Sequence, residues 1–411
     1  MKKQRRILAL ALASIMIFAF AFTGCTTKTT SDSDKTQQGN TGDPTQIAEK
    51  NATPAPTPSP SPTPKPEVKS PKVKAIYLTG WTAGNPAKIQ QIVNLSKTTE
   101  LNAVVIDIKD DDGKVGYETA ISEVREIGGW EKKYDVDKAI KTLHENNIYV
   151  IGRLVCFKDP ILAQKKPEVA YKSKNGGVWK DQNGKPWVNP MSKETWEYIW
   201  KIAREAKEKG FDEIQFDYVR FCNDGDTKLM DFGPDFDPNT KSDTIAEFLN
   251  KSYTEIHDKL GIPLTADVFG IAAVSSGDDK IIGQNWEKLA KEVDYMCPMV
   301  YPSHYANVRQ NGVGQGINGV TFGKPDLEPY NVIYQTLLAG KKRLANVEHK
   351  AKIRPYLQAF TAPWLGAGYY QKYGTEQVKQ QIKAVYDAGY EEWILWDPNN
   401  NYPAEYFEAK K

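Results

Sequence analysis

The sequence has few of the residues on which metal and thiol chemistry depend. Its 411 residues include only four cysteines and four histidines. Cys156, Cys222 and Cys297 can form one disulfide at most, and their spacing is not that of a zinc site, so we expect buried free thiols. So few histidines disfavour a histidine-rich zinc hydrolase. A Gly-x-Ser-x-Gly elbow is also missing, which disfavours a serine hydrolase.

A basic surface is missing as well. The formal net charge is +2, but Lys2, Lys3, Arg5 and Arg6 lie in an N-terminal segment that we expect to be removed, and +2 − 4 = −2. The rest of the chain has no run of lysine and arginine longer than three residues. Electrostatic capture of nucleic acid is therefore not expected.

The N-terminus has the order of a secretory signal. Basic residues precede an apolar run over 7–22, which Thr23-Gly24-Cys25 follows. Thr-Gly-Cys resembles a bacterial lipobox with Cys25 acylated, although ordinary signal cleavage is the alternative. No second apolar run of about 18 residues follows. We expect residues 1–24 to be a lipoprotein signal peptide, and the protein to be secreted through the Sec pathway and lipid-anchored at Cys25 to the outer face of the bacterial cell membrane.

Residues 25–71 have almost no large apolar side chain. Between Thr53 and Pro64, proline alternates with small residues. This composition cannot bury a core and favours extended polyproline II conformation, so we predict a disordered Pro/Thr/Ser-rich linker. A semi-rigid stalk and a tether without a spacing role are both compatible with it.

From residue 72 to 411, short apolar segments alternate with amphipathic ones. Strands are predicted at 73–81, 103–109, 148–157, 213–221, 263–269, 294–301, 351–360 and 392–396. Helices are predicted at 86–97, 136–146, 193–209, 243–260, 286–292, 330–345 and 376–387. This order predicts an α/β fold, a single (β/α)8 TIM barrel. An open doubly wound sheet is the alternative, but no Gly-rich phosphate loop follows the first strand.

The long connections all follow strands rather than helices. They span residues 110–134, 158–192, 222–242 and 302–329. In barrel enzymes such loops gather at the carboxyl ends of the strands, which is where the active site lies. We therefore looked for chemistry at the ends of the predicted strands.

The strand Glu213–Phe221 contains an unusual polar residue. Asp217 places a carboxylate where an apolar residue would cost less, and it shares a face with Gln215. We predict that this face lines the barrel and that Asp217 is catalytic.

Other polar residues near strand ends are predicted to meet Asp217. They are Asp107, Lys109, Arg153, Thr265, Asp267, Tyr301, Arg354, Gln358 and Asp397. Two carboxylates flanking a glycosidic bond can hydrolyse it without metal or histidine. Aromatic residues such as Trp81 and Trp396 also fall at strand ends or in the loops, where they could stack on sugar rings.

Four segments resemble one known family. Phe216–Phe221, Val105–Asp110, Pro298–Tyr305 and Trp393–Asp397 together resemble the bacterial DUF4015 family of barrel glycoside hydrolases, over about residues 73–403. The resemblance implies sugar hydrolysis without naming a substrate, and its motif implies that Tyr301 and His304 line the sugar pocket. A more distant resemblance to other barrel glycosidases gives Asp217 the role of nucleophile.

The general acid is predicted to be Asp267 on the neighbouring strand, with Asp397 and Asp107 as alternatives. Adjacent strands lie about 4.8 Å apart. This spacing suits the carboxyl separation of a retaining enzyme, about 5–5.5 Å, better than an inverting one. Arg153 or Arg220 is expected to be the cation beside Asp217. The predicted substrate-binding residues are Trp81, Asp107, Lys109, Arg153, Arg220, Tyr301, His304, Gln358, Trp396 and Asp397.

The sequence thus predicts a lipid-anchored extracellular glycoside hydrolase that acts on a polysaccharide or oligosaccharide and needs no cofactor. A carbohydrate-binding lipoprotein without catalysis is the first alternative. A metal-dependent deacetylase or phosphodiesterase that uses Asp107, Asp217 and Asp267 is the second. Asp110-Asp111-Asp112-Gly113 has the start of a calcium loop, but the remaining ligand spacing is missing, so a solvated acidic turn is expected.

Overall fold

A computed structural model describes residues 68–234 and 236–410 of the chain. The predicted signal peptide, the lipidation site Cys25 and most of the predicted linker lie outside these residues and stay predictions. Within the described ranges, none of the helices has the length and apolar character needed to cross a membrane.

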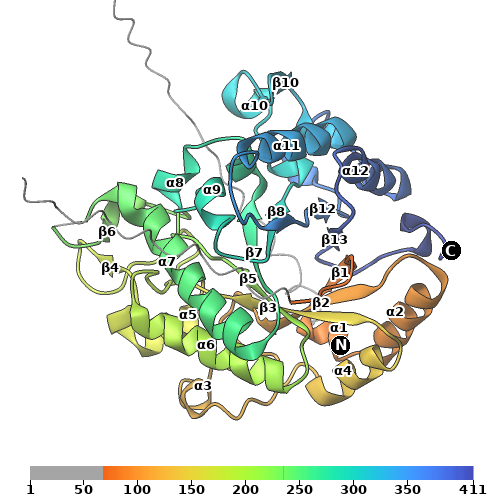
Figure 1. The fold of residues 1–411 in the computed structure, drawn as a ribbon. Coiled ribbons are helices and arrows are strands. Elements are labelled where there is room, and N and C mark those ends of the chain that lie inside the picture. Colours follow the sequence, from red (N-terminus) through yellow and green to blue (C-terminus); the bar gives the residue numbers. More distant parts are fainter. Residues whose placement is uncertain (1–67, 235, 411) are drawn as a thin grey trace, which may run out of the picture. The chain divides into compact units, whose positions relative to one another are not determined.

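Parallel strands form a ring at the centre of the molecule (Figure 1). They are β1 (Lys74–Leu78), β2 (Ala103–Lys109), β3 (Tyr149–Val155), β5 (Glu213–Asp217), β7 (Leu264–Phe269), β8 (Tyr295–Met299), β11 (Lys352–Ile353) with β12 (Tyr356–Gln358), and β13 (Trp393–Trp396). β11 and β12 share one place in the ring and are separated at Arg354-Pro355, where proline has no N–H to donate. Since β13 pairs with β1, the described residues close into an eight-stranded parallel barrel, which confirms the predicted fold.

Helices surround the strands (Figure 1). They are α1 (Gly80–Ala83), α2 (Pro86–Thr98), α3 (Ser122–Glu126), α4 (Val136–His144), α5 (Pro160–Lys165), α6 (Lys193–Glu208), α7 (Lys241–Tyr253), α8 (Asp278–Ile281), α9 (Trp286–Leu289), α10 (Val308–Asn311), α11 (Pro329–Arg343) and α12 (Thr375–Asp387). A π-helical turn, Thr254–Asp258, continues α7. After α6 and α12 the chain turns at Gly210 (φ 101°) and Gly389 (φ 82°), a backbone conformation that glycine adopts without a steric penalty.

Local sequence explains where the helices begin and which side they bury. Asn85 caps α2 by accepting hydrogen bonds from the N–H groups of Ala87 and Lys88, and Asp135 caps α4 in the same way. On α6 the buried positions recur at helical spacing; they include Trp196, Ile199, Ile202, Ala203 and Ala206. This stripe packs against the barrel because its burial is the main source of helix stability.

The strands are buried on both faces. On β2, Val104 and Ile106 pack into the outer layer between barrel and helices, whereas Ala103 and Val105 belong to the inner layer. Two-sided burial explains why the strands read as continuous apolar runs in the sequence. A polar side chain on the inner face, such as that of Asp217, is therefore an exception with a cause to be found.

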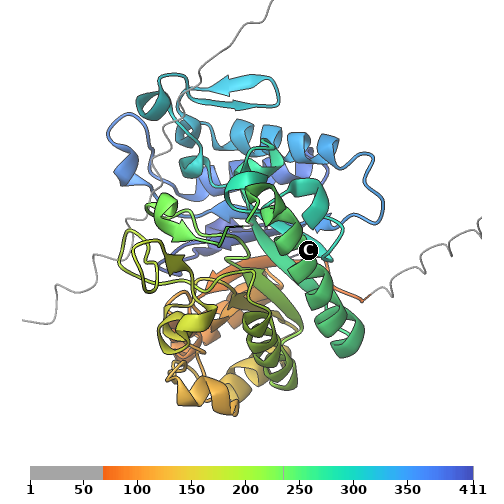
Figure 2. The same cartoon turned by 90° about the vertical axis from the view of Figure 1, so that its left-hand side faces the viewer.

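The long connections gather at the carboxyl ends of the strands, and we call this end of the barrel the mouth. Two of them are joined where β4 (Lys172–Ser173) pairs with β6 (Met230–Asp231). A third forms the hairpin of β9 (Gln315–Ile317) and β10 (Val320–Phe322), seen in cyan at the top of Figure 2. Their position after strands agrees with the prediction from the sequence.

Both ends of the described chain lie at the amino ends of the strands, away from the mouth. At one end, the N–H of Trp393 donates to the carbonyl of Val73 (3.1 Å). At the other, the N–H of Glu100 donates to Glu408 (2.9 Å), just before β2 begins. The described part of the chain therefore begins and finishes on the face opposite its long loops.

Candidate active site

An arginine joins two of the predicted carboxylates at the mouth. Arg153 on β3 donates from Nε and Nη2 to Oδ2 of Asp217 (2.9 and 2.5 Å) and from Nη1 to Oδ1 of Asp107 (2.6 Å). These side chains are 8–13 % exposed, so water and a ligand can reach them. Charge-assisted hydrogen bonds favour the ionised carboxylate, so Arg153 is the cation beside Asp217.

Asp217 is the last residue of β5, whereas the sequence predicted a strand up to Phe221. The next residue, Tyr218, has φ 51°, in the left-handed region. Its N–H donates to Oδ1 of Asp217 (2.6 Å). A left-handed backbone at a residue other than glycine costs about 1–3 kcal/mol and is often found at functional sites. The chain thus turns sharply just where the predicted nucleophile lies.

Asp267 lies beside Asp217 on the neighbouring strand. Phe216 of β5 is in register with Ala266 of β7, so the two aspartates follow at the same level. Asp267 is only 2 % exposed, and its Oδ1 has no hydrogen-bond partner in the structure. Burial, and secondly the negative charge of Asp217, raise the pKa of Asp267 well above its usual value. A carboxyl group in this state can hold a proton at neutral pH and donate it.

The two alternative acids are more fully engaged. Asp107 accepts a hydrogen bond from the hydroxyl of Tyr77 (2.7 Å) besides that from Arg153; burial raises its pKa to about 6, and these partners limit the rise. The oxygens of Asp397 accept the backbone N–H groups of Asn399 and Asn401 (3.0 Å each) and so stabilise the turn after β13. Asp267 therefore has the free oxygen that a general acid needs.

Aromatic rings lie next to the carboxylates. Trp396 is half-buried and lies 5.8 Å from the ring of Tyr301 and 6.2 Å from that of Tyr77. Phe360 is 5.1 Å from Trp396 and is stacked on Trp364. The row reaches from beside Asp107 to the loop after β12, and aromatic faces of this kind stack on sugar rings.

His304 and Trp81 are the exposed aromatic side chains among the predicted site residues. The ring of His304 lies 5.1 Å from Tyr301, and the surrounding protein, by displacing water, lowers the pKa of His304 to about 4. Its imidazole is therefore neutral at pH 7. Trp81, on α1 just after β1, is 59 % exposed, and the ammonium of Lys133 lies 5.9 Å from its ring.

The prediction that Lys109 contacts substrate is wrong. A bulge near the end of β2 places Lys109 opposite Leu154, a residue of the outer layer, rather than on the face of Asp107. Its ammonium is fully buried and pairs with Asp159 (2.6 Å). Lys109 therefore holds the loop after β3 and does not face the mouth.

Arg220 and Gln358 also differ from the prediction. Arg220 follows the left-handed turn, so the alternation of a strand no longer applies, and its guanidinium bonds to Asn223 (2.9 Å) and Asp224 (3.3 Å) rather than to Asp217. Gln358 is fully buried; its amide accepts from the N–H of Ser303 and donates to Asp326. Both side chains therefore bond to loop residues, and Gln358 has no exposed surface for a substrate.

Sequence reasoning missed Tyr77 and Phe360. Tyr77 reaches both Asp107 and, through its ring, Arg153 (5.6 Å). A tyrosine in an apolar strand does not indicate this role. Tyr77 meets Asp107 because of the register between β1 and β2, which neither strand's sequence predicts. The aromatic character of Phe360, next to the end of the seventh strand, was the available signal.

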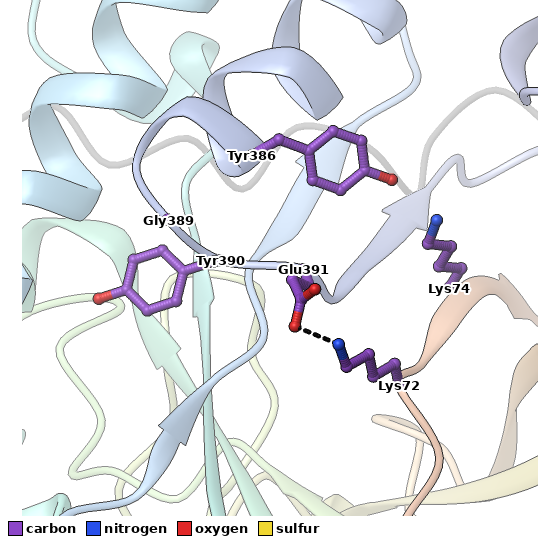
Figure 3. A pocket seen from close by; sticks show the side chains of 6 residues that line it. All are labelled: Lys72, Lys74, Tyr386, Gly389, Tyr390 and Glu391. Carbon is purple, nitrogen blue, oxygen red and sulfur yellow. Dashed lines mark ion pairs between the residues drawn. The ribbon is translucent and has the colours of Figure 1, made fainter.

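One open pocket lies at the amino ends of the strands, opposite the mouth. Figure 3 shows this pocket, which has a volume of about 410 Å³ and is lined in part by Lys72, Lys74, Tyr386 and Glu391. Lys72 and Glu391 form an exposed ion pair across it (2.6 Å). The residues that could perform chemistry lie at the mouth instead, so we assign the candidate site there.

The site shows no arrangement for a metal. Within residues 68–234 and 236–410, no group of three or more His, Cys, Asp or Glu side chains is arranged to hold an ion. The guanidinium of Arg153 lies between Asp107 and Asp217, in the place where a cation shared by these carboxylates would bind. The arrangement instead offers two neighbouring carboxyl groups, a guanidinium and an aromatic surface.

Comparison with solved structures supports the fold. The glycoside hydrolase domain of PgaB (BpsB) from Bordetella bronchiseptica has a TM-score of 0.61 and 12 % identity, and the match covers 83 % of this chain and all of that one. A hypothetical protein from Ruminiclostridium thermocellum is 54 % identical over 47 % of this chain and 97 % of its own, with a TM-score of 0.43. A search among curated proteins found no match.

A protein-family model matches most of the chain. Residues 75–402 match the DUF4015 family, described as "Putative glycosyl hydrolase domain". The match spans the barrel from β1 to the turn after β13, and it agrees with the resemblance seen in the sequence motifs. The chain therefore belongs to the DUF4015 family of glycosyl hydrolase domains.

Proposed function

We propose that the protein is a glycoside hydrolase with Asp217 as nucleophile and Asp267 as general acid and base. The observation that carries the proposal is the contrast between these neighbours. Asp217 accepts three hydrogen bonds from Arg153 and Tyr218, whereas Asp267 is buried with an unpartnered oxygen and a raised pKa. Two carboxyl groups whose environments differ in this way are the mark of an acid and a nucleophile.

The reaction proceeds in two steps. Asp267 gives its proton to the glycosidic oxygen as the bond to the leaving sugar breaks, and Asp217 attacks the anomeric carbon to form a covalent glycosyl ester. In the second step the Asp267 carboxylate takes a proton from water, whose oxygen attacks the same carbon and releases Asp217. Two displacements retain the configuration of the sugar, as expected for carboxyl groups on adjacent strands.

The aromatic row binds the sugar next to these residues. The half-buried ring of Trp396 is the surface on which a pyranose would stack, while Tyr301 and exposed His304 line the side of the pocket. Arg153 and Asp107 offer hydrogen bonds to hydroxyl groups close to Asp217. A carbohydrate with apolar ring faces and equatorial hydroxyls fits this mixture of groups.

A glycan panel tests the activity. The chain purified without its signal peptide is incubated with oligosaccharides and polysaccharides, and products are identified by mass spectrometry. Cleavage that is lost in the Asp217→Asn and Asp267→Asn variants is the expected result. Binding without cleavage by the wild type would favour the carbohydrate-binding alternative, and cleavage that survives both changes would refute the assignment.

Two further measurements test the mechanism. NMR of the first-formed product should show the same anomeric configuration as the substrate; the opposite configuration would mean inversion. Incubation with EDTA should leave the rate unchanged, whereas loss of activity would favour the metal-dependent alternative.

The proposed location rests on the N-terminal sequence. The basic residues, the apolar run and Thr23-Gly24-Cys25 favour export and lipid attachment of the glycosidase to the outer face of the cell membrane. Labelled palmitate should be incorporated into the wild type and not into Cys25→Ala. Equal labelling of the two proteins would refute acylation at Cys25.

A further inference from the structure

The residue after Asp217 controls one of its two oxygens. The N–H of Tyr218 donates to Oδ1 of Asp217 (2.6 Å), while Arg153 bonds only Oδ2. The N–H lies in the peptide plane that joins Asp217 to Tyr218, and with the plane in this orientation Tyr218 has φ 51°. A flip of the plane would bring φ of Tyr218 into the extended region, turn the N–H away and leave Oδ1 without this donor. Something must hold this residue in a conformation that a tyrosine rarely adopts.

The side chain of Tyr218 is held by a lysine and a tryptophan. The ammonium of Lys158, from the loop after β3, lies 4.7 Å from the ring and 3.3 Å from the hydroxyl. The ring also meets Trp187 edge to face, with centroids 5.6 Å apart. Burial would lower the pKa of Lys158, but Tyr218 and Asp111 raise it above its usual value, so the ammonium stays charged.

Lys158 is held in turn by the acidic turn after β2. Its Nζ bonds Oδ2 of Asp111 (2.8 Å), and Lys158 itself is 13 % exposed. The neighbouring carboxylates of the turn pair elsewhere: Asp110 with Lys133, and Asp112 with Lys185 (2.5 Å). Asp112 and Lys185 are both exposed, and their ion pair does not include Tyr218 or Asp217. The sequence suggested a solvated acidic turn. In the structure its three carboxylates are each paired with a lysine.

We propose that Asp111, Lys158 and Tyr218 form a positioning chain that fixes the carboxylate of Asp217. The three residues come from the segments after β2, β3 and β5, so Asp217 is oriented only when these loops are assembled together. None of the three is proposed to react with the sugar. The proposal rests on the proposed function for its catalytic consequence, but the geometry can be tested without it.

Lys158→Met and Asp111→Asn test the chain, with Asp112→Asn and Lys185→Met as matched controls from the same turn. We expect kcat to fall about 10- to 100-fold in the first two variants, because a misplaced reacting group slows the chemical step. KM should change less than about twofold, since the aromatic surface is untouched. The double variant Asp111→Asn/Lys158→Met should be no slower than the slower single variant, because both changes break one chain.

The split between kcat and KM separates positioning from general loss of structure. Asp112→Asn and Lys185→Met should keep the wild-type kcat and KM. Equal loss of activity in the controls, or unchanged kcat in both test variants, would overturn the proposal. The side chain of Asp111 is 46 % exposed, so we expect Asp111→Asn to fold. A loss of activity in this variant therefore reports on positioning rather than on unfolding.

Crystal structures of Lys158→Met and Asp112→Asn give a readout independent of any glycan. We expect Tyr218 to leave the left-handed region and the Asp217 carboxylate to rotate in Lys158→Met alone. If the wild type cleaves no glycan but this rotation is seen, the positioning chain stands and the proposed function fails. If Tyr218 and Asp217 keep their conformations in Lys158→Met, the positioning chain is refuted whatever the activity.

Discussion

The two ends of the barrel treat buried carboxylates differently. On β5, Glu213 at the amino end is fully buried and accepts Arg354 (2.6 Å) and the hydroxyl of Thr265 (3.1 Å). At the mouth end of the same pair of strands, Asp267 is almost as buried but keeps an unpartnered oxygen. Buried polar groups are normally satisfied, and those that are not need an explanation. The comparison indicates that the amino end stabilises the fold and that the mouth is kept for chemistry.

The largest expected effect is at the mouth. Asp217→Asn should lower kcat by about 10⁴-fold or more, as for other nucleophiles that act as part of a unit. The thermal midpoint should also fall, because the single amide oxygen can accept from Arg153 or from Tyr218 but not from both, so kcat is measured at a temperature where the variant is folded. If the variant kept more than a tenth of the wild-type activity on a glycan that the wild type cleaves, the assignment of chemistry to the mouth and of stability to the amino end would be wrong.

Asp267→Asn sharpens the assignment of the acid. The rate on a natural glycoside should fall about 10²- to 10⁴-fold, since the leaving oxygen is no longer protonated. The rate of the first step on an aryl glycoside with an acidic phenol should fall much less, because this leaving group needs no proton. The alkaline limb of the pH profile of kcat/KM should disappear. Equal losses on both substrates would show that Asp267 is not the acid.

Glu213→Gln tests the opposite end. We expect the free energy of unfolding in urea to fall by about 3 kcal/mol, because Arg354 then keeps only one carboxylate partner, Glu392 (2.9 Å), and its charge is partly uncompensated. At a temperature where the variant is folded, kcat and KM should equal those of the wild type. A large loss of kcat with unchanged stability would contradict the division of roles.

The smallest effect is a pH dependence of stability at Asp107. Its pKa rises from 3.8 to about 6 on folding, mainly through burial. Between these values the folded state keeps a proton that the unfolded state has lost, so stability falls as pH rises from about 4 to 6 and is level above. Urea unfolding at several pH values should show a shallower decline in Asp107→Asn; parallel curves would contradict it.

The barrel was predictable from the sequence because its strands are buried on both faces and several of its helices end at a glycine, such as Gly210 and Gly389. Strand and helix limits agree within a few residues, apart from the break between β11 and β12 and the early end of β5. Both exceptions are backbone features, a proline and a left-handed residue. Hydrophobic pattern reports burial along the chain and carries no signal for such local geometry.

The site was predictable only in part. Asp107, Arg153, Asp217 and Asp267 meet because alternation on regular strands holds for them. Lys109 was placed on the wrong face because a bulge adds one residue and reverses the alternation beyond it. The role of Tyr77 depends on the register between two strands, which no single strand encodes.

The position of the chain ends has a practical consequence. Both ends of the described chain lie at the amino ends of the strands, near Val73 and Glu408. A bead, a surface or a fusion partner joined through either end would therefore be held behind the barrel, with the mouth directed away from it. Immobilisation through one end and cross-linking through the other would load the same face, which leaves the loops around Asp217 free to admit a long polymer.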